Sequence, residues 1–147
     1  MPTTLVTDLW PTDLFGAPST PTPVAVLRQQ GEALGARTHN FVLGEVDTES
    51  NPQGTVFTHK LMLVAPFLRY RKPMLYVHHD LQPFPAEVYE GELTRPQNQE
   101  QWRQTVSNEQ ELQDRLREFF NEPRVKEVLR TVFNLSNDVA PVENAGM

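Results

Sequence analysis

The chain contains no cysteine at any of its 147 positions. Disulfide bonds, thiolate nucleophiles and cysteine-ligated zinc or iron–sulfur centres are therefore excluded as sources of stability or chemistry. A chain of this length can bury a core large enough for one domain without such covalent or metal links. The lack of cysteine is compatible with the reducing cytosol, and we expect a cytoplasmic protein.

Long hydrophobic runs are also lacking. The longest strongly apolar run covers only residues 61–65, whereas a membrane-spanning helix needs about 20 apolar residues. The first residues show neither the basic start nor the apolar stretch of a signal peptide. We therefore expect no membrane partner and no export signal.

Positive charge is scarce, because 13 Lys and Arg stand against 19 Asp and Glu and the net charge is −6. Binding to nucleic acid depends on the neutralisation of phosphates by Lys and Arg. This balance argues against a nucleic-acid partner.

Motifs that carry known chemistry are missing as well. The chain has no Gly-rich phosphate loop, no G-x-S-x-G nucleophile elbow and no H-E-x-x-H zinc motif. We therefore expect no cofactor and no metal site.

The first 21 residues form a segment rich in Pro and Thr, a composition that argues against regular structure. They nevertheless carry two apolar pairs, Leu9-Trp10 and Leu14-Phe15. We predict an extended arm over residues 1–21 whose Trp10 and Phe15 dock on the sheet face that the helices leave open. The alternative is that these side chains bind a partner or a second copy of the chain.

A helix is predicted directly after this arm. Thr22 is a suitable N-cap, Pro23 suits the first helical position, and Gly35 lies where a C-terminal stop is expected. The helix has one apolar face, with Gly31 beside it.

The middle of the chain shows the pattern of strands. We predict four of them, at about residues 39–47, 56–65, 74–79 and 86–92. The polar run between the first two contains Pro52 and Gly54, which favour a turn and predict a hairpin. Short connections favour an antiparallel meander. Apolar residues on both sides of the first two strands predict that both faces of the sheet are covered.

The last third predicts two helices. Ser107 and Gln110 match a capping box, and residues 121–123 end one helix and begin the next. We expect an αα-hairpin that packs on the sheet, with fraying beyond Leu135 and a frayed tail over residues 138–147.

The expected fold is a single α+β domain over residues 22–137, with a helix, a meander of about four strands and two C-terminal helices. This order is similar to that of ubiquitin-conjugating-like and RWD-type domains, in which a Tyr-Pro-containing loop lies beside the last strand. The comparable stretch here is residues 82–88, with Pro83 and Pro85. The resemblance implies a protein-binding module, because a chain without cysteine cannot perform the thioester chemistry of conjugating enzymes.

The best candidates for catalysis are His78 and Asp80. Successive side chains of a strand alternate between its faces, so these two share one face while His79 points to the other. An imidazole held by a carboxylate is the usual arrangement of a general base. A metal at this point would need at least one further ligand.

The other histidines, His39 and His59, also lie in predicted strands. If Val46 pairs with Val56, the two imidazoles share a face but lie about 13 Å apart. A register shifted by one residue places them on opposite faces. Both registers exclude a shared site.

One basic cluster is present, at residues 69–72. Arg69, Arg71 and Lys72 could bind a phosphate or a carboxylate, because arginine offers a planar bidentate fork. The alternative is pairing within the chain, which is common for charge runs. The available carboxylates on the C-terminal helices are Glu109, Glu111, Asp114 and Glu118.

Together these patterns predict a non-enzymatic protein-binding module, such as a small cytosolic adaptor, an immunity-type protein or a regulator. It would bind a protein partner or form a homo-oligomer, with Trp10 and Phe15 as interaction residues. The alternative is a small hydrolase or nuclease-like enzyme that uses His78 and Asp80.

Overall fold

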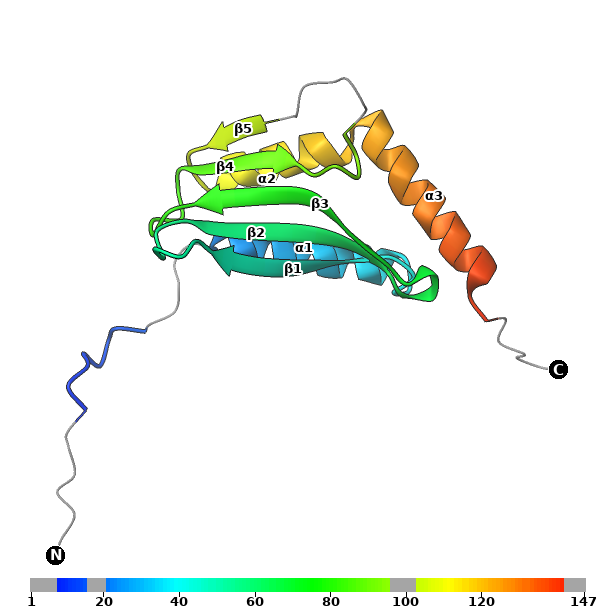
Figure 1. Cartoon of the computed structure of the whole chain (residues 1–147). Helices are drawn as coiled ribbons and strands as arrows, with labels where there is room; N and C mark the ends of the chain where they lie inside the picture. Colours follow the sequence, from blue (N-terminus) through cyan, green and yellow to red (C-terminus); the bar gives the residue numbers. More distant parts are fainter. Residues whose placement is uncertain (1–7, 16–20, 96–102, 142–147) are drawn as a thin grey trace, which may run out of the picture.

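The structure, a computed structural model, describes residues 8–15, 21–95 and 103–141 (Figure 1). One sheet lies at its centre, with helices on one side. The elements are α1 (Pro23–Arg37), β1 (Leu43–Ser50), β2 (Phe57–Ala65), the 3-10 turn η1 (Pro66–Leu68), β3 (Tyr70–His79), β4 (Ala86–Glu90), β5 (Arg103–Val106), α2 (Glu109–Phe120) and α3 (Pro123–Val139).

The sheet is an antiparallel meander in which each strand pairs with the next along the chain, in the order β1-β2-β3-β4-β5. The predicted α+β class and the antiparallel meander are confirmed. The fifth strand was not predicted, because its sequence Arg-Gln-Thr-Val lacks the apolar alternation that marks a strand. The order implied by the resemblance to RWD-type domains is present, with β5 as an additional strand.

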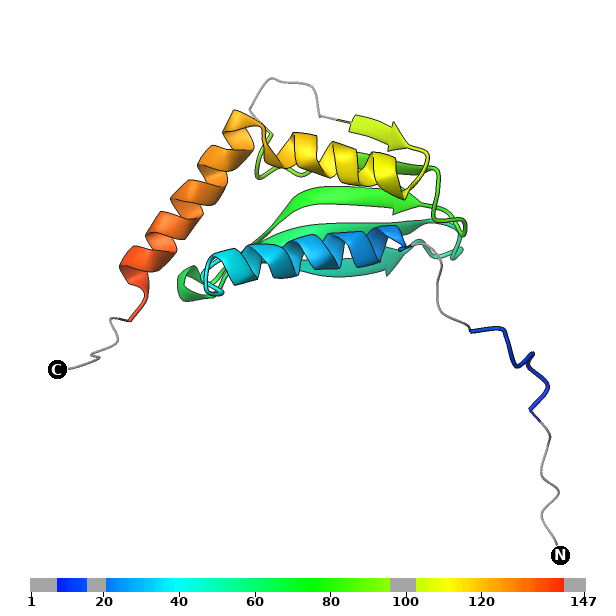
Figure 2. The same cartoon turned by 180° about the vertical axis from the view of Figure 1, so that it is seen from behind.

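The layers are asymmetric. Helices α1 and α2 lie next to each other over one face of the sheet, whereas α3 diverges from α2 and runs past the end of the sheet (Figure 2). The two C-terminal helices are therefore present, but they do not form the expected αα-hairpin. Aromatic contacts hold α3 in this position. The ring centroid of Phe133 in α3 lies 6.1 Å from that of Phe41, and the Phe41 centroid lies 5.5 Å from that of Phe67 in η1.

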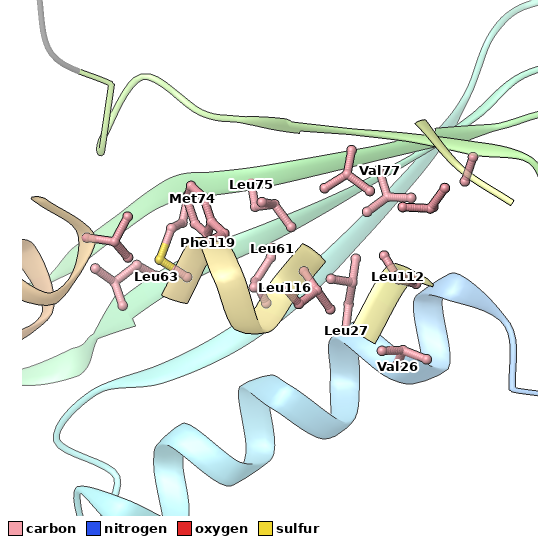
Figure 3. Packing of buried hydrophobic residues seen from close by; sticks show 14 of the residues in the cluster. Val26, Leu27, Leu61, Leu63, Met74, Leu75, Val77, Leu112, Leu116 and Phe119 are labelled. Carbon is pink, nitrogen blue, oxygen red and sulfur yellow. The ribbon is translucent and has the colours of Figure 1, made fainter. Parts of the chain in front are cut away.

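The core lies between the sheet and the helices α1 and α2 (Figure 3). Its largest fully buried apolar side chains are Leu27, Leu61, Leu63, Leu75, Leu112, Leu116 and Phe119. Gly31 brings α1 directly onto β1, since a Cβ atom at this position would lie 2.3 Å from the carbonyl oxygen of Gly44. This backbone contact sets how closely the first helix approaches the sheet.

The start of α1 is as predicted, and its end is not. The Thr22 side chain accepts a hydrogen bond from the Ala25 N–H, and Pro23 is the first helical residue. The helix continues past Gly35 to Arg37. Gly35 serves packing rather than termination, because a Cβ atom there would lie 2.9 Å from the Asn40 side chain.

His39 is not in a strand, which corrects the prediction. His39 and Asn40 adopt left-handed conformations, with φ of 51° and 63°, in the turn between α1 and β1. The Thr38 hydroxyl stabilises this turn by donating to the Leu34 and Val42 carbonyls. The first strand therefore begins at Leu43 instead of residue 39.

Other boundaries shift by a few residues. β3 begins at Tyr70, because Pro73 is accommodated beside an irregularity in its pairing with β2. The N-cap of α2 is Asn108, whose side chain accepts from the Glu111 N–H at 2.9 Å, rather than Ser107. α3 continues to Val139, past the expected fraying point, and the remainder of the predicted tail from residue 142 lies outside the described residues.

The second face of the sheet is open, and no described element covers it (Figure 1). Trp10 and Phe15 are 72% and 89% exposed, so the predicted docking of the arm on this face is wrong. The physical reason is the character of the face. Apolar side chains occupy it near one end of β2, at Met62 and Val64, while most positions toward the other end are charged, or are aromatic and carry a polar group.

Candidate functional site

Two rows of side chains cross the open face of the sheet, since residues paired directly across strands point to the same side. One row is Asp47, Lys60, Tyr76, Tyr89 and Arg103, and the other is Glu49, Thr58, His78, Glu87 and Thr105. The rings of Tyr76 and Tyr89 stack at 5.3 Å in the middle of the sheet. Ion pairs from Lys60 to Glu49 and from Arg103 to Glu87, at 3.0 and 2.8 Å, flank them. The face is a mixed polar and aromatic surface.

His78 lies on this face and is half-buried there. Its Nδ1 is 2.6 Å from the Thr58 hydroxyl, and its ring is 4.6 Å from that of Tyr89. Burial lowers the pKa of His78 below its ordinary value. The neutral ring therefore predominates at neutral pH.

Asp80 has a different partner. It follows the end of β3, and its carboxylate accepts a hydrogen bond from the Gln82 N–H at 2.8 Å. Among the described residues, no hydrogen bond joins His78 to Asp80. The structure thus does not place the two predicted catalytic residues in a bonded dyad.

The predicted anion-binding cluster is not assembled either. Both terminal nitrogens of Arg71 donate to the Asp47 carboxylate, at 2.9 and 2.8 Å, and this guanidinium holds the pKa of Asp47 below its usual range. Arg69 lies in a left-handed turn before β3, and Lys72 alternates to the opposite side of the strand. Pairing within the chain is therefore found for Arg71, with a carboxylate of β1 instead of those of the C-terminal helices.

A histidine pair is the main feature that sequence reasoning missed. Nε2 of His59 lies 2.7 Å from Nε2 of His79 on the helix-covered face of the sheet. Val46 pairs with Leu61, so neither hairpin register considered from the sequence is the one that forms. Between β2 and β3, Phe57 pairs with His79. This register makes His59 and His79 diagonal neighbours on adjacent strands.

The hydrogen bonds of this pair constrain its protons. The Asp80 carbonyl can only accept, so Nδ1 of His79, at 2.6 Å, donates to it. One Nε2 atom of the pair donates to the other, and Nδ1 of His59 forms a hydrogen bond with the Thr48 hydroxyl at 2.8 Å. Burial, followed by the proximity of His79, lowers the pKa of His59 to about 4. Both rings are satisfied, which identifies the pair as a structural element.

Metal binding gains no support from these histidines. Two nitrogen ligands of a tetrahedral zinc, each about 2.0–2.1 Å from the metal, lie roughly 3.3 Å apart, farther than the two Nε2 atoms. In the part of the chain that the structure describes, no group of three His, Asp or Glu side chains is arranged to hold a metal ion.

A groove lies among α1, α2 and α3, with a volume of ≈ 480 Å³. Its floor is apolar and includes Leu61, Met74 and Leu116, which Figure 3 shows between the helices and the sheet. Its walls include the half-buried side chains Leu34, Phe120 and Leu129. This volume lies within the range of about 300–1,000 Å³ that is typical of ligand pockets.

The charged residues that line this groove are all positive. Arg37 of α1, Arg117 of α2 and Lys126 of α3 line it, and no Asp or Glu does. Arg117 pairs with Asp114 at 3.3 Å, while Arg37 and Lys126 form no ion pair with a described residue. Three cations around an apolar floor stand out in a chain with a net charge of −6. The sequence does not reveal this cluster of cations, because the three residues are far apart in the chain and only the packing of the helices brings them together.

Comparisons with known proteins give no match to a family model, a curated protein or a solved structure. Within the described residues, no helix has the length and apolar character needed to cross a membrane.

Proposed function

We propose that this chain is a non-enzymatic protein-binding module of the cytoplasm, acting as an adaptor, an immunity-type protein or a regulator. The observation that carries the proposal is the exposure of four large apolar side chains within residues 8–15. Leu9, Trp10, Leu14 and Phe15 are 85%, 72%, 45% and 89% exposed. Scattered apolar side chains on a surface need no explanation, whereas clustered ones mark interaction sites.

The segment also has local structure that presents these side chains. The Trp10 N–H donates to the Asp8 carboxylate at 3.0 Å, and the Leu14 N–H donates to the Pro11 carbonyl at 3.3 Å. The first bond fixes the backbone before Trp10, and the second forms a turn between the two apolar pairs. A segment with such turns loses less conformational entropy on binding than a fully flexible one.

Aromatic side chains are well suited to bind a hydrophobic pocket on a protein. Trp and Phe each bury about 150–250 Å² when they dock, and tryptophan is enriched among the residues that dominate interface energies. At about 25 cal/mol per Å², the pair would contribute several kcal/mol before the entropy of association is subtracted. The acidic charge balance favours a protein over a nucleic acid as the partner.

The test is a binding experiment with matched variants. A double substitution, Trp10→Ala with Phe15→Ala, is expected to abolish capture of the native partner in pull-downs, at an unchanged melting temperature because both side chains are exposed. Leu81→Ala removes an equally exposed apolar side chain outside the arm, with 81% exposure, and serves as the control. Partner capture that survives the double substitution would show that the arm is not the binding element.

A further inference from the structure

Among the residues that the structure describes, no element covers the apolar floor of the groove among α1, α2 and α3. Leu34, Phe120 and Leu129 lie at its walls and are only partly buried, although they contact the core. Any occupant that covers them must be apolar at the centre and negatively charged at the edge, because the charged groups lining the groove are Arg37, Arg117 and Lys126.

Residues 8–15 have this chemistry. They contain two carboxylates, Asp8 and Asp13, and no Lys or Arg, together with the four exposed apolar side chains described above. The described part of the chain thus carries an exposed segment that is acidic and aromatic, and a groove with an apolar floor and a positively charged rim.

We infer that the groove binds residues 8–15 of a second copy of the chain, an inference that rests on the proposed function and names its partner. Trp10 or Phe15 covers the apolar floor, and Asp8 and Asp13 approach the cations of the rim. Reciprocal exchange of two arms would give a closed dimer with two-fold symmetry.

Chain geometry favours exchange over docking of an arm on its own groove. The groove begins at Gln30 of α1, eight residues after Thr22, or about 12 Å along the helix. The link from Phe15 to Thr22 spans at most about 25 Å when fully extended. An arm that binds its own groove must reverse direction and run back along its own helix, whereas the arm of a second copy can approach the groove without this reversal.

The first experiment locates the arm directly. A photo-reactive phenylalanine analogue replaces Phe15 in the full-length chain, which is irradiated over a range of concentrations. We expect a covalent dimer whose cross-links map to residues 30–37 and 113–129. Cross-links to the same segments at the mass of a monomer would show docking within one chain and would overturn the inference.

The second experiment tests complementarity by mixing. An arm variant, Trp10→Ser with Phe15→Ser, and a groove variant, Arg37→Glu with Lys126→Glu, are each expected to weaken dimerisation at least tenfold in sedimentation velocity. An equimolar mixture regains a heterodimer, because one variant keeps its groove and the other keeps its arm. Arg69→Glu with Lys72→Glu, which reverses two exposed cations outside the groove, is the control and leaves dimerisation unchanged.

The outcomes separate this inference from the proposed function. A mixture that stays monomeric, or a dimer that survives both variants, overturns the exchange of arms. Native mass spectrometry that finds a fatty acid whose removal exposes the groove would assign the groove to a small molecule instead. If the probe at position 15 captures a different protein from the native extract and never a second copy, the binding function stands and the inference fails. If the probe captures no protein at all, both fail.

Discussion

Replacing Gly31 with alanine adds one methyl group at the closest contact between α1 and β1. The new Cβ atom would lie 2.3 Å from the Gly44 carbonyl oxygen and 2.7 Å from its carbon. Both are backbone atoms of a paired strand and cannot rotate away. An ordinary contact begins at 3.4 Å, so α1 and β1 must separate by about 1 Å.

Two opposing effects set the size of the change. Alanine is favoured over glycine inside a helix by about 0.8–1 kcal/mol. Overpacking costs about 1–3 kcal/mol or more, and a gap of 0.5–1 Å loses about a quarter to a half of the dispersion energy of the contacts beside it. Val26 and Leu27 lie on the same helix and are buried against the sheet, so they lose contacts when α1 moves. We expect a net destabilisation of about 2 kcal/mol.

Urea unfolding and thermal melting measure this effect. A loss of about 2 kcal/mol corresponds to a fall in Tm of roughly 5–8 °C for a domain of this size. Gly35→Ala on the same helix is the control, because its Cβ atom would meet the Asn40 side-chain oxygen at 2.9 Å, which can rotate away, and the Leu43 Cβ atom at 3.3 Å, which is only a slight overlap. We expect this variant to lie within about 1 kcal/mol of the wild type. A Gly31→Ala protein as stable as the wild type or more stable, as helix propensity alone requires, would refute the reasoning.

Two further predictions concern buried polar groups. Arg124→Met removes the guanidinium that donates at 2.8 Å to the carboxylate of Glu90, which is 1% exposed; we expect a loss of about 3 kcal/mol in urea unfolding. Arg115→Met, which breaks the exposed ion pair with Glu118, is the control and should cost less than about 1 kcal/mol of stability. Equal losses in the two variants would contradict a stabilising role of the buried Arg124–Glu90 pair. The pKa of His59 is about 4 in the folded chain, below the ordinary value of 6.5 that it has in the unfolded chain. Between pH 6.5 and 4, His59 is therefore protonated in the unfolded chain and largely neutral in the folded chain. Stability should be full above pH 6.5 and fall by roughly 3 kcal/mol as the pH approaches 4, with a contribution of the same sign from His78. His59→Gln should remove most of this slope in urea titrations between pH 4.5 and 7.5, and an unchanged slope would exclude His59 as its source.

Local chemistry along the chain was sufficient to predict most of the elements. Thr22 and Pro23 start α1, and Pro123 starts α3, because caps and proline act through bonds to their immediate neighbours. The polar run with Gly54 is the turn of the predicted hairpin, and Gly54 adopts a φ of 69°. The class of fold follows from the order of these elements, since short links between strands leave an antiparallel meander as the simplest arrangement.

Register and packing were decided only by tertiary structure. The pairing of Val46 with Leu61 depends on which side chains the helices cover. The pairing of Phe57 with His79 between β2 and β3 makes His59 and His79 neighbours. β5 is a strand because β4 offers it a free edge, and its own residues carry no such pattern.

The candidate groove likewise combines residues that the sequence shows with an arrangement that only tertiary packing produces. The sequence contains its cations, Arg37, Arg117 and Lys126, as ordinary surface residues of three separate helices. Two features of the packing bring these three cations to one groove. The close approach of Gly31 to Gly44 positions α1, and the angle between α2 and α3 leaves the groove between them. Helical periodicity determines which face of each helix is apolar, but the angles and distances between helices arise from contacts between residues far apart in the chain. The sequence by itself therefore determined most of the elements and the class of fold, and the tertiary structure decided which charges meet around an apolar floor.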